Sequence, residues 1–116
     1  MGEGADLGGL PVSGMEITMS QTVLLELSLK PDALEAGKEA IRETLKATAA
    51  AEGNENLVVI VDDADPTKVV IIETWRAAAD HDAYLAWRAT PEGASTLGSI
   101  VAAAPVTRTF EEYVAL

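Results

Sequence analysis

Cysteine is absent from this 116-residue chain, and its absence removes three kinds of site. A disulfide framework, a thiolate metal site and a cysteine nucleophile all need the missing thiol. The chain also lacks the run of about 18 apolar residues that a membrane-spanning helix requires. No basic segment followed by an apolar stretch opens the sequence. We therefore expect no secretory signal and a cytoplasmic location.

Basic residues and histidine are scarce. Eight lysines and arginines face nineteen acidic residues, which gives a formal net charge of −11. This field repels phosphate backbones and anionic lipids, so we expect neither nucleic acid nor a membrane as a partner. His81 is the only histidine, and a metal site without cysteine would have to rely on carboxylates. We expect no metal and no cofactor, since phosphate-loop and dinucleotide-binding motifs are also missing.

Length and composition favour a single folded domain. Apolar residues make up 48% of the chain, which is enough for a buried core even in a small protein. Residues 1–20 contain five glycines and a proline without any apolar period. We predict a disordered leader over residues 1–20 and a folded domain over residues 21–116.

The domain is predicted to begin with a strand and a helix. Residues 22–29 alternate between a fully apolar face and a mixed face, as a half-buried strand does. Asp32 lies three residues before Glu35, which predicts a capping box at the start of a helix over residues 33–52. Gly53 stands where a helix commonly receives its C-terminal cap.

A hairpin, further helical segments and a last strand are predicted to follow. Apolar and β-branched residues indicate two strands, over residues 56–61 and 68–75, joined by an acidic turn. Helical segments are expected over residues 77–90 and 92–103, and residues 106–114 alternate again. The order β-α-β-β-α-β is typical of the α+β ferredoxin-like fold. This fold has a four-stranded antiparallel sheet with helices on one face.

Both faces of the predicted hairpin are apolar, although helices cover only one face of such a sheet. Val58 and Ile60 point to one face, and the residues between and around them point to the other. An uncovered apolar patch of roughly several hundred Å² is rare on a monomer. We therefore predict a homodimer in which the two sheets pack face to face.

Several short motifs occur in order along the predicted elements. They are Lys30-Pro31-Asp32, Ala51-Glu52-Gly53, Asp65-Pro66-Thr67 and Glu73-Thr74-Trp75, followed by an alanine-rich helix with Tyr84-Leu85. In order and spacing they resemble the antibiotic biosynthesis monooxygenase domain over residues 22–114. The resemblance implies a dimeric α/β barrel with a pocket between sheet and helices in each subunit. It also implies an oxidation of phenols, anthrones or quinols by O₂ without metal or flavin, although some members degrade haem.

His81 and Tyr84 are the candidate catalytic residues. On a helix they share a face with Arg88, at spacings of three and four residues. An imidazole can accept a phenolic proton near neutral pH, and the tyrosine would orient the substrate. The alternative places His81 on the exposed side of the helix, between Asp80 and Asp82, as part of a solvated charged patch.

Glu73 and Trp75 lie on one face of their strand and are candidate substrate-binding residues. A carboxylate beside a tryptophan in an apolar pocket has a raised pKa and can act as a general base. The favoured alternatives are a core position for Trp75 and a salt bridge from Glu73. The partner of that salt bridge would be Arg76, Arg88 or Arg108.

Trp87, Arg88 and Arg108 complete the substrate-binding candidates. Trp87 is expected to wall the pocket or, preferably, to pack in the core, and the arginines are candidate partners of a substrate anion. Relatives that degrade haem carry an iron-ligating histidine at the position of Ala94. The resemblance therefore argues against haem degradation by this chain.

These residues lead to the hypothesis of a cofactor-independent monooxygenase acting on a small aromatic substrate. One alternative is a non-catalytic dimeric protein that binds a small ligand, and another is an isomerase or cyclase that moves protons without oxygen. The orientation of His81 and Tyr84, into a closed cavity or out to solvent, distinguishes the first two.

Overall fold

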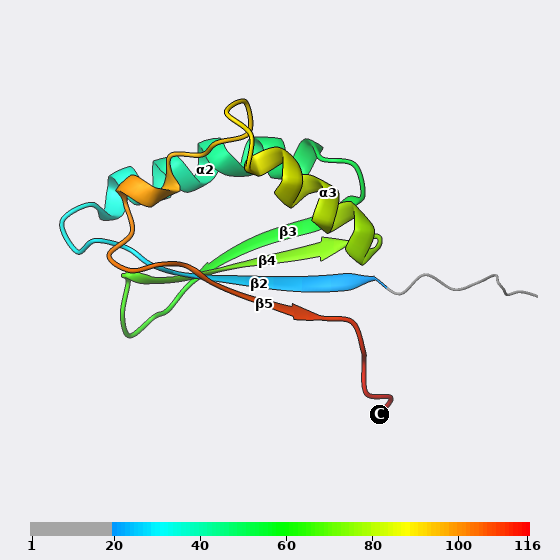
Figure 1. Ribbon diagram of the computed structural model, residues 1–116. Coiled ribbons are helices and arrows are strands. Elements are labelled where there is room, and N and C mark those ends of the chain that lie inside the picture. The colour runs from blue at the N-terminus through cyan, green and yellow to red at the C-terminus, as the bar shows by residue number, and fades with distance from the viewer. Residues whose placement is uncertain (1–19) are drawn as a thin grey trace, which may run out of the picture.

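The fold follows the order of elements predicted from the sequence. The computed structural model describes residues 20–116, and residues 1–19 of the expected leader lie outside the described residues. The elements are β2 (Gln21–Ser28), α2 (Leu34–Ala50), β3 (Asn54–Val61), β4 (Lys68–Trp75), α3 (Ala78–Arg88), the 3-10 turn η2 (Leu97–Ser99) and β5 (Val106–Phe110) (Figure 1).

The strands form one four-stranded antiparallel sheet in the order β3-β4-β2-β5. Helices α2 and α3 lie over one face of this sheet, and no described helix lies over the other face (Figure 1). The predicted α+β ferredoxin-like fold is therefore confirmed. Among residues 20–116, no helix combines the length and the apolar character needed to cross a membrane.

The core fills the space between the helices and the sheet. Alternate residues of β4 point toward the helices, and Val69 and Ile71 among them are fully buried. Ile41 of α2 belongs to the same apolar cluster. The alternation continues to the end of β4 and brings Glu73 and Trp75 to the helix side as well. A carboxylate and an indole thus lie beneath α3, at the end of a strand that otherwise builds the core.

The predicted helix over residues 92–103 is wrong, because only Leu97–Ser99 forms a helical turn. The chain instead turns tightly after α3, where the Gly93 N–H donates to the Thr90 carbonyl oxygen 3.1 Å away. A Cβ on Gly93 would lie 2.0 Å from the Trp87 carbonyl oxygen. The segment therefore folds back against the end of α3, and this close approach requires a glycine.

Two predicted element ends are also corrected. The last strand, expected over residues 106–114, ends at Phe110. The capping box is absent, because the helix is preceded by Ala33 and no side chain caps it. The Ala33 N–H donates to the Lys30 carbonyl oxygen 3.0 Å away, which places Asp32 inside a turn before the helix.

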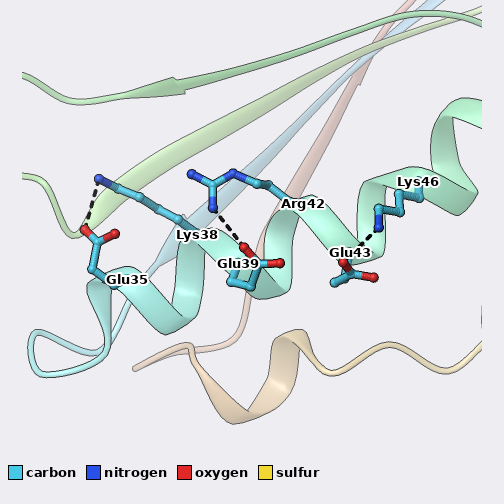
Figure 2. A network of polar contacts seen from close by, with 6 residues as sticks. All are labelled: Glu35, Lys38, Glu39, Arg42, Glu43 and Lys46. Carbon is cyan, nitrogen blue, oxygen red and sulfur yellow. Dashed lines mark hydrogen bonds and ion pairs between the residues drawn. The ribbon is translucent and has the colours of Figure 1, made fainter.

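The outer face of α2 carries three acidic–basic pairs, each spaced three residues apart (Figure 2). They are Glu35–Lys38 at 3.6 Å, Glu39–Arg42 at 3.0 Å and Glu43–Lys46 at 2.9 Å. Exposed pairs at this spacing each contribute only a small stabilisation, because water screens them. They support the helix from its solvent side and leave its inner face to the core and the cavity.

Gly53 lies in the turn that leads from α2 into β3. Its φ is 86°, in the left-handed region that glycine adopts without a steric penalty. The helix itself is capped by Ala51, so the glycine predicted as the cap lies two residues further on. A Cβ at this position would lie 2.4 Å from the Cβ of Asp80. Gly53 is therefore required for both its conformation and its close contact with α3.

The substitution Gly53→Ala is expected to lower the free energy of unfolding by at least about 1–2 kcal/mol, the usual cost of the left-handed conformation for a residue with a Cβ. Urea denaturation measures this change. Gly98→Ala is the matched control, because a Cβ there meets no atom within 4 Å. An equal effect of both substitutions would contradict the explanation.

Candidate active site

A cavity of about 190 Å³ lies between the sheet and the helices. The buried residues that line it come from both layers of the fold. They are Val23 of β2, Thr48 of α2, Ile71 and Glu73 of β4, and His81 of α3. These residues form the floor of the cavity, which combines apolar strand residues with one carboxyl group and one imidazole.

The remaining walls of the cavity are mostly apolar. Leu25, Leu45 and Leu97 line it and are half-buried. Leu85, Ser95 and Thr107 also line it but are exposed, and they mark its mouth. The cavity is thus a mostly apolar slot with a carboxyl group and an imidazole on its floor, an arrangement common in small-molecule sites.

Glu73 is 4% exposed and accepts a hydrogen bond from the Trp75 indole N–H, with 2.8 Å between Nε1 and Oε1. Burial raises the pKa of its carboxyl group, and the Trp75 bond and the positive charge of Arg88 oppose this only in part. The expected salt bridge is wrong. Among the described ion pairs, Arg76 and Arg108 bind other carboxylates, those of Asp80 and Glu52 and that of Glu26.

His81 is also 4% exposed, so its placement in an exposed charged patch is wrong. Its ring lies 5.4 Å from the Trp75 ring and 6.5 Å from the Tyr84 ring, measured between centroids. Burial lowers the pKa of the imidazole, and the negative charge of Asp82 opposes this shift. Since the ordinary value is 6.5, the imidazole is neutral at pH 7 and able to accept a proton.

Tyr84 and Arg88 belong to a hydrogen-bond cluster that joins the helices. The Arg88 Nε donates to the Tyr84 hydroxyl oxygen at 2.6 Å, and this hydroxyl lies 2.6 Å from the Thr48 hydroxyl. The other Arg88 nitrogens donate to the carbonyl oxygens of Thr44, at 2.7 Å, and of Gly93, at 3.1 Å. Both side chains line the cavity, yet their polar atoms are already bound to protein groups.

The two tryptophans have different environments. Trp75 is fully buried and does not line the cavity, which agrees with the favoured core position. Trp87 is 39% exposed, so its favoured placement in the core is wrong. It lines an outer groove of about 410 Å³ between α2 and α3, where Tyr84 forms part of the wall as well. Arg88 lies over the Trp87 ring, 5.0 Å from its centroid.

Arg108 is not near the cavity. It lies on β5 opposite Leu24, on the sheet face that the helices leave open. There it pairs with Glu26 at 3.4 Å and lies over the Phe110 ring, 5.5 Å from its centroid. The structure therefore brings Glu73, His81, Tyr84 and Arg88 together and leaves Arg108 apart.

Thr48 is a site residue that the sequence prediction did not single out. It is fully buried, and its hydroxyl contacts both Tyr84 and Arg88. The sequence did carry a signal for this role, because Thr48 is a polar residue on the otherwise apolar stripe of its helix. Within residues 20–116, no group of three His, Cys, Asp or Glu side chains is placed to hold a metal ion.

The family model for antibiotic biosynthesis monooxygenase matches residues 20–95, which is well over half of the chain. This chain belongs to the antibiotic biosynthesis monooxygenase family. No protein of curated function matches the sequence. The family assignment agrees with the resemblance seen in the short sequence motifs and with the ferredoxin-like fold.

Solved structures support the same fold for this family member. A conserved protein from Methanosarcina mazei has a TM-score of 0.73 at 14% identity, covering 83% of this chain and 95% of that one. A Nitrosomonas europaea protein described as a candidate antibiotic biosynthesis monooxygenase has a TM-score of 0.69 at 22% identity, with 81% and 99% coverage. A Mycobacterium tuberculosis protein has a TM-score of 0.69 at 15% identity, with 83% and 97% coverage. At these identities, the likeness shows the fold alone.

The raised pKa of Glu73 predicts how stability depends on pH in this family member. The folded state holds the proton more tightly than the unfolded state, so stability falls as pH rises from 4.5 through the folded pKa. Glu73→Gln keeps an acceptor for Trp75 and removes the buried charge. We expect it to raise the free energy of unfolding at pH 7, with a smaller gain near pH 4.5.

Urea denaturation at the two pH values measures this difference, and Glu55→Gln, at an exposed position of β3, is the control. If Glu73→Gln destabilised the protein at pH 7 more than at pH 4.5, the charge of Arg88 would outweigh the effect of burial.

Proposed function

We propose that this protein is a cofactor-independent monooxygenase that oxidises an electron-rich aromatic molecule, such as a quinol, an anthrone or a phenol, with O₂. One observation carries the proposal. His81 is a buried imidazole with a lowered pKa, and it lies on the floor of an apolar cavity large enough for a ligand. A base of this kind can remove the proton of a phenolic hydroxyl where water does not compete.

The proposed reaction begins when His81 takes the hydroxyl proton of a phenol. The electron-rich anion passes one electron to O₂, and the two radicals combine at a ring carbon that bears hydrogen. The resulting peroxide takes the proton back from His81. Loss of water then leaves a carbonyl group, so a phenol and O₂ give a quinone and one water molecule.

The other residues of the cavity would support the anion. Arg88 contributes a positive charge, and its donors are bound to Tyr84 and to backbone carbonyls, so it would act through its field and not by direct contact. Tyr84 would form the wall beside the ring. Glu73, whose pKa is raised by burial, would accept a hydrogen bond from a substrate hydroxyl group when ionised and could donate one when protonated.

The alternative of a non-catalytic binding protein has less support. His81 and Tyr84 both line the cavity, which favours the catalytic proposal. A protein that only holds an apolar ligand has no need of a buried base, and burying one without a role costs stability.

We also propose that the protein works as a cytoplasmic homodimer. The sheet face that the helices leave open carries Val58, Ile60, Val106 and Phe110, which are 40%, 49%, 51% and 42% exposed. Leu24, Val70 and Ile72 lie between them on the central strands. A second copy of the sheet offers the same apolar residues, so face-to-face packing would cover both sets.

Oxygen uptake with hydroquinones and anthrones tests the catalytic proposal. His81→Gln keeps a polar side chain of similar size but removes the base. We expect it to lower the rate at least tenfold, about 1.4 kcal/mol of transition-state stabilisation. Asp63→Asn, at an exposed position in the turn between β3 and β4, should keep more than half of the rate. No uptake with any substrate, or a rate indifferent to His81→Gln, would count against the proposal.

Light scattering at micromolar concentration tests the dimer. We expect a mass twice the 12.1 kDa of the single chain. Ile60→Lys places a charge in the open apolar face and should shift the protein toward the monomer. Ala36→Lys adds the same charge at an exposed position of α2 and should leave the mass unchanged. A wild-type monomer would refute the face-to-face arrangement.

A further inference from the structure

We infer that the cavity accepts a single aromatic ring, inserted with a hydroxyl group toward Glu73 and His81, and excludes molecules with a second ring fused beside that hydroxyl group. This inference rests on the proposed function, because it narrows the substrate class of the same site. The size of the cavity, the stiffness of its walls and the position of its polar groups each contribute to it.

The size of the cavity limits the size of the ligand. Its volume is about 190 Å³. An apolar cavity of about 150 Å³ holds one benzene ring, whereas sites for larger ligands span about 300–1,000 Å³. One ring with a small substituent therefore fills the enclosed part of this cavity, and a second ring fused beside the hydroxyl group would exceed it.

The walls leave little room for expansion. Val23 and Ile71 belong to β2 and β4, the two central strands, which are each paired on both sides. Arg88 bonds to the Thr44 and Gly93 carbonyl oxygens and so fixes α2 and the turn after α3. Close-packed interiors of this kind do not open by the width of a ring without loss of stability.

The distribution of polar groups sets the orientation of the ring. Glu73 and His81 are buried on the floor, whereas the surrounding walls include four leucines, and the polar atoms of Tyr84 and Arg88 in the walls are already bound to protein groups. A phenol satisfies both when its hydroxyl points inward and its ring contacts Leu45 and Leu97. A substituent para to the hydroxyl then points to the mouth beside Ser95, where space is open to solvent. Ortho-fused rings would meet the walls.

Binding measured without oxygen tests the inference separately from turnover. Calorimetric titration under nitrogen compares 4-ethylphenol with 1-naphthol and with 1,8-dihydroxyanthrone. A fused molecule that displaces 4-ethylphenol binds in this cavity, whereas one that binds without displacing it occupies the outer groove. We expect 4-ethylphenol to bind at least tenfold more tightly than either fused molecule. Equal or tighter binding of a fused molecule, or no binding of 4-ethylphenol at millimolar concentration, would overturn the inference.

Leu97→Ala provides the matched change in the cavity. Leu97 lines the wall from η2, and its truncation should strengthen 1-naphthol binding at least fivefold while it weakens that of 4-ethylphenol. Leu34→Ala, which shortens a half-buried leucine of α2 outside the cavity, should change neither. If Leu97→Ala left the ratio of the affinities for 4-ethylphenol and 1-naphthol unchanged, the size of the cavity would not be the cause of the preference for one ring.

Oxygen uptake then separates the two proposals. Selective binding of 4-ethylphenol without uptake of O₂ would uphold the size limit and refute the monooxygenase. Uptake with 1,8-dihydroxyanthrone at a rate equal to that of a single-ring quinol would uphold the monooxygenase and refute the size limit.

Discussion

The guanidinium group of Arg88 holds together the segments that enclose the cavity. It donates to the Thr44 carbonyl on α2, to the Tyr84 hydroxyl on α3 and to the Gly93 carbonyl in the following turn. Hydrogen bonds from a charged donor are stronger than neutral ones, and bonds within one cluster reinforce each other. Together with the hydrogen bond between the Thr48 and Tyr84 hydroxyl groups, this side chain sets the spacing of the two helices above the sheet and with it the width of the cavity.

A second constraint is the burial of two titratable groups on the same floor. The strand alternation that turns Val69 and Ile71 toward the core also turns Glu73 toward it. Helix α3 packs over this end of β4 and buries His81 beside it. Burial raises the pKa of the acid and lowers that of the base, so it shifts each group toward its neutral form. The same loss of water that costs stability makes the imidazole a base near neutral pH, which suits the proposed proton transfer.

Sequence reasoning was most accurate where regular alternation along a strand decides the outcome and less accurate where a single hydrogen bond does. The strand Lys68–Trp75 has the predicted bounds, because alternation needs only its own residues. The capping role of Asp32 failed because a bond from Ala33 to Lys30 places the aspartate in a turn. The salt bridge of Glu73 failed for a similar reason, because the indole N–H of Trp75, two residues further along the same strand, is the hydrogen-bond donor to its carboxyl group.

The sequence by itself determined the order of elements, the family and the presence of an apolar face on each side of the hairpin, because these follow from periodicity and from motifs a few residues long. Only the tertiary structure decided that His81 is buried although aspartates flank it, and that Trp87 is exposed although it is aromatic. It also decided that Thr48, far away in the chain, contacts Tyr84. The burial of a side chain depends on what packs across from it, and that information lies in the contacts between distant segments.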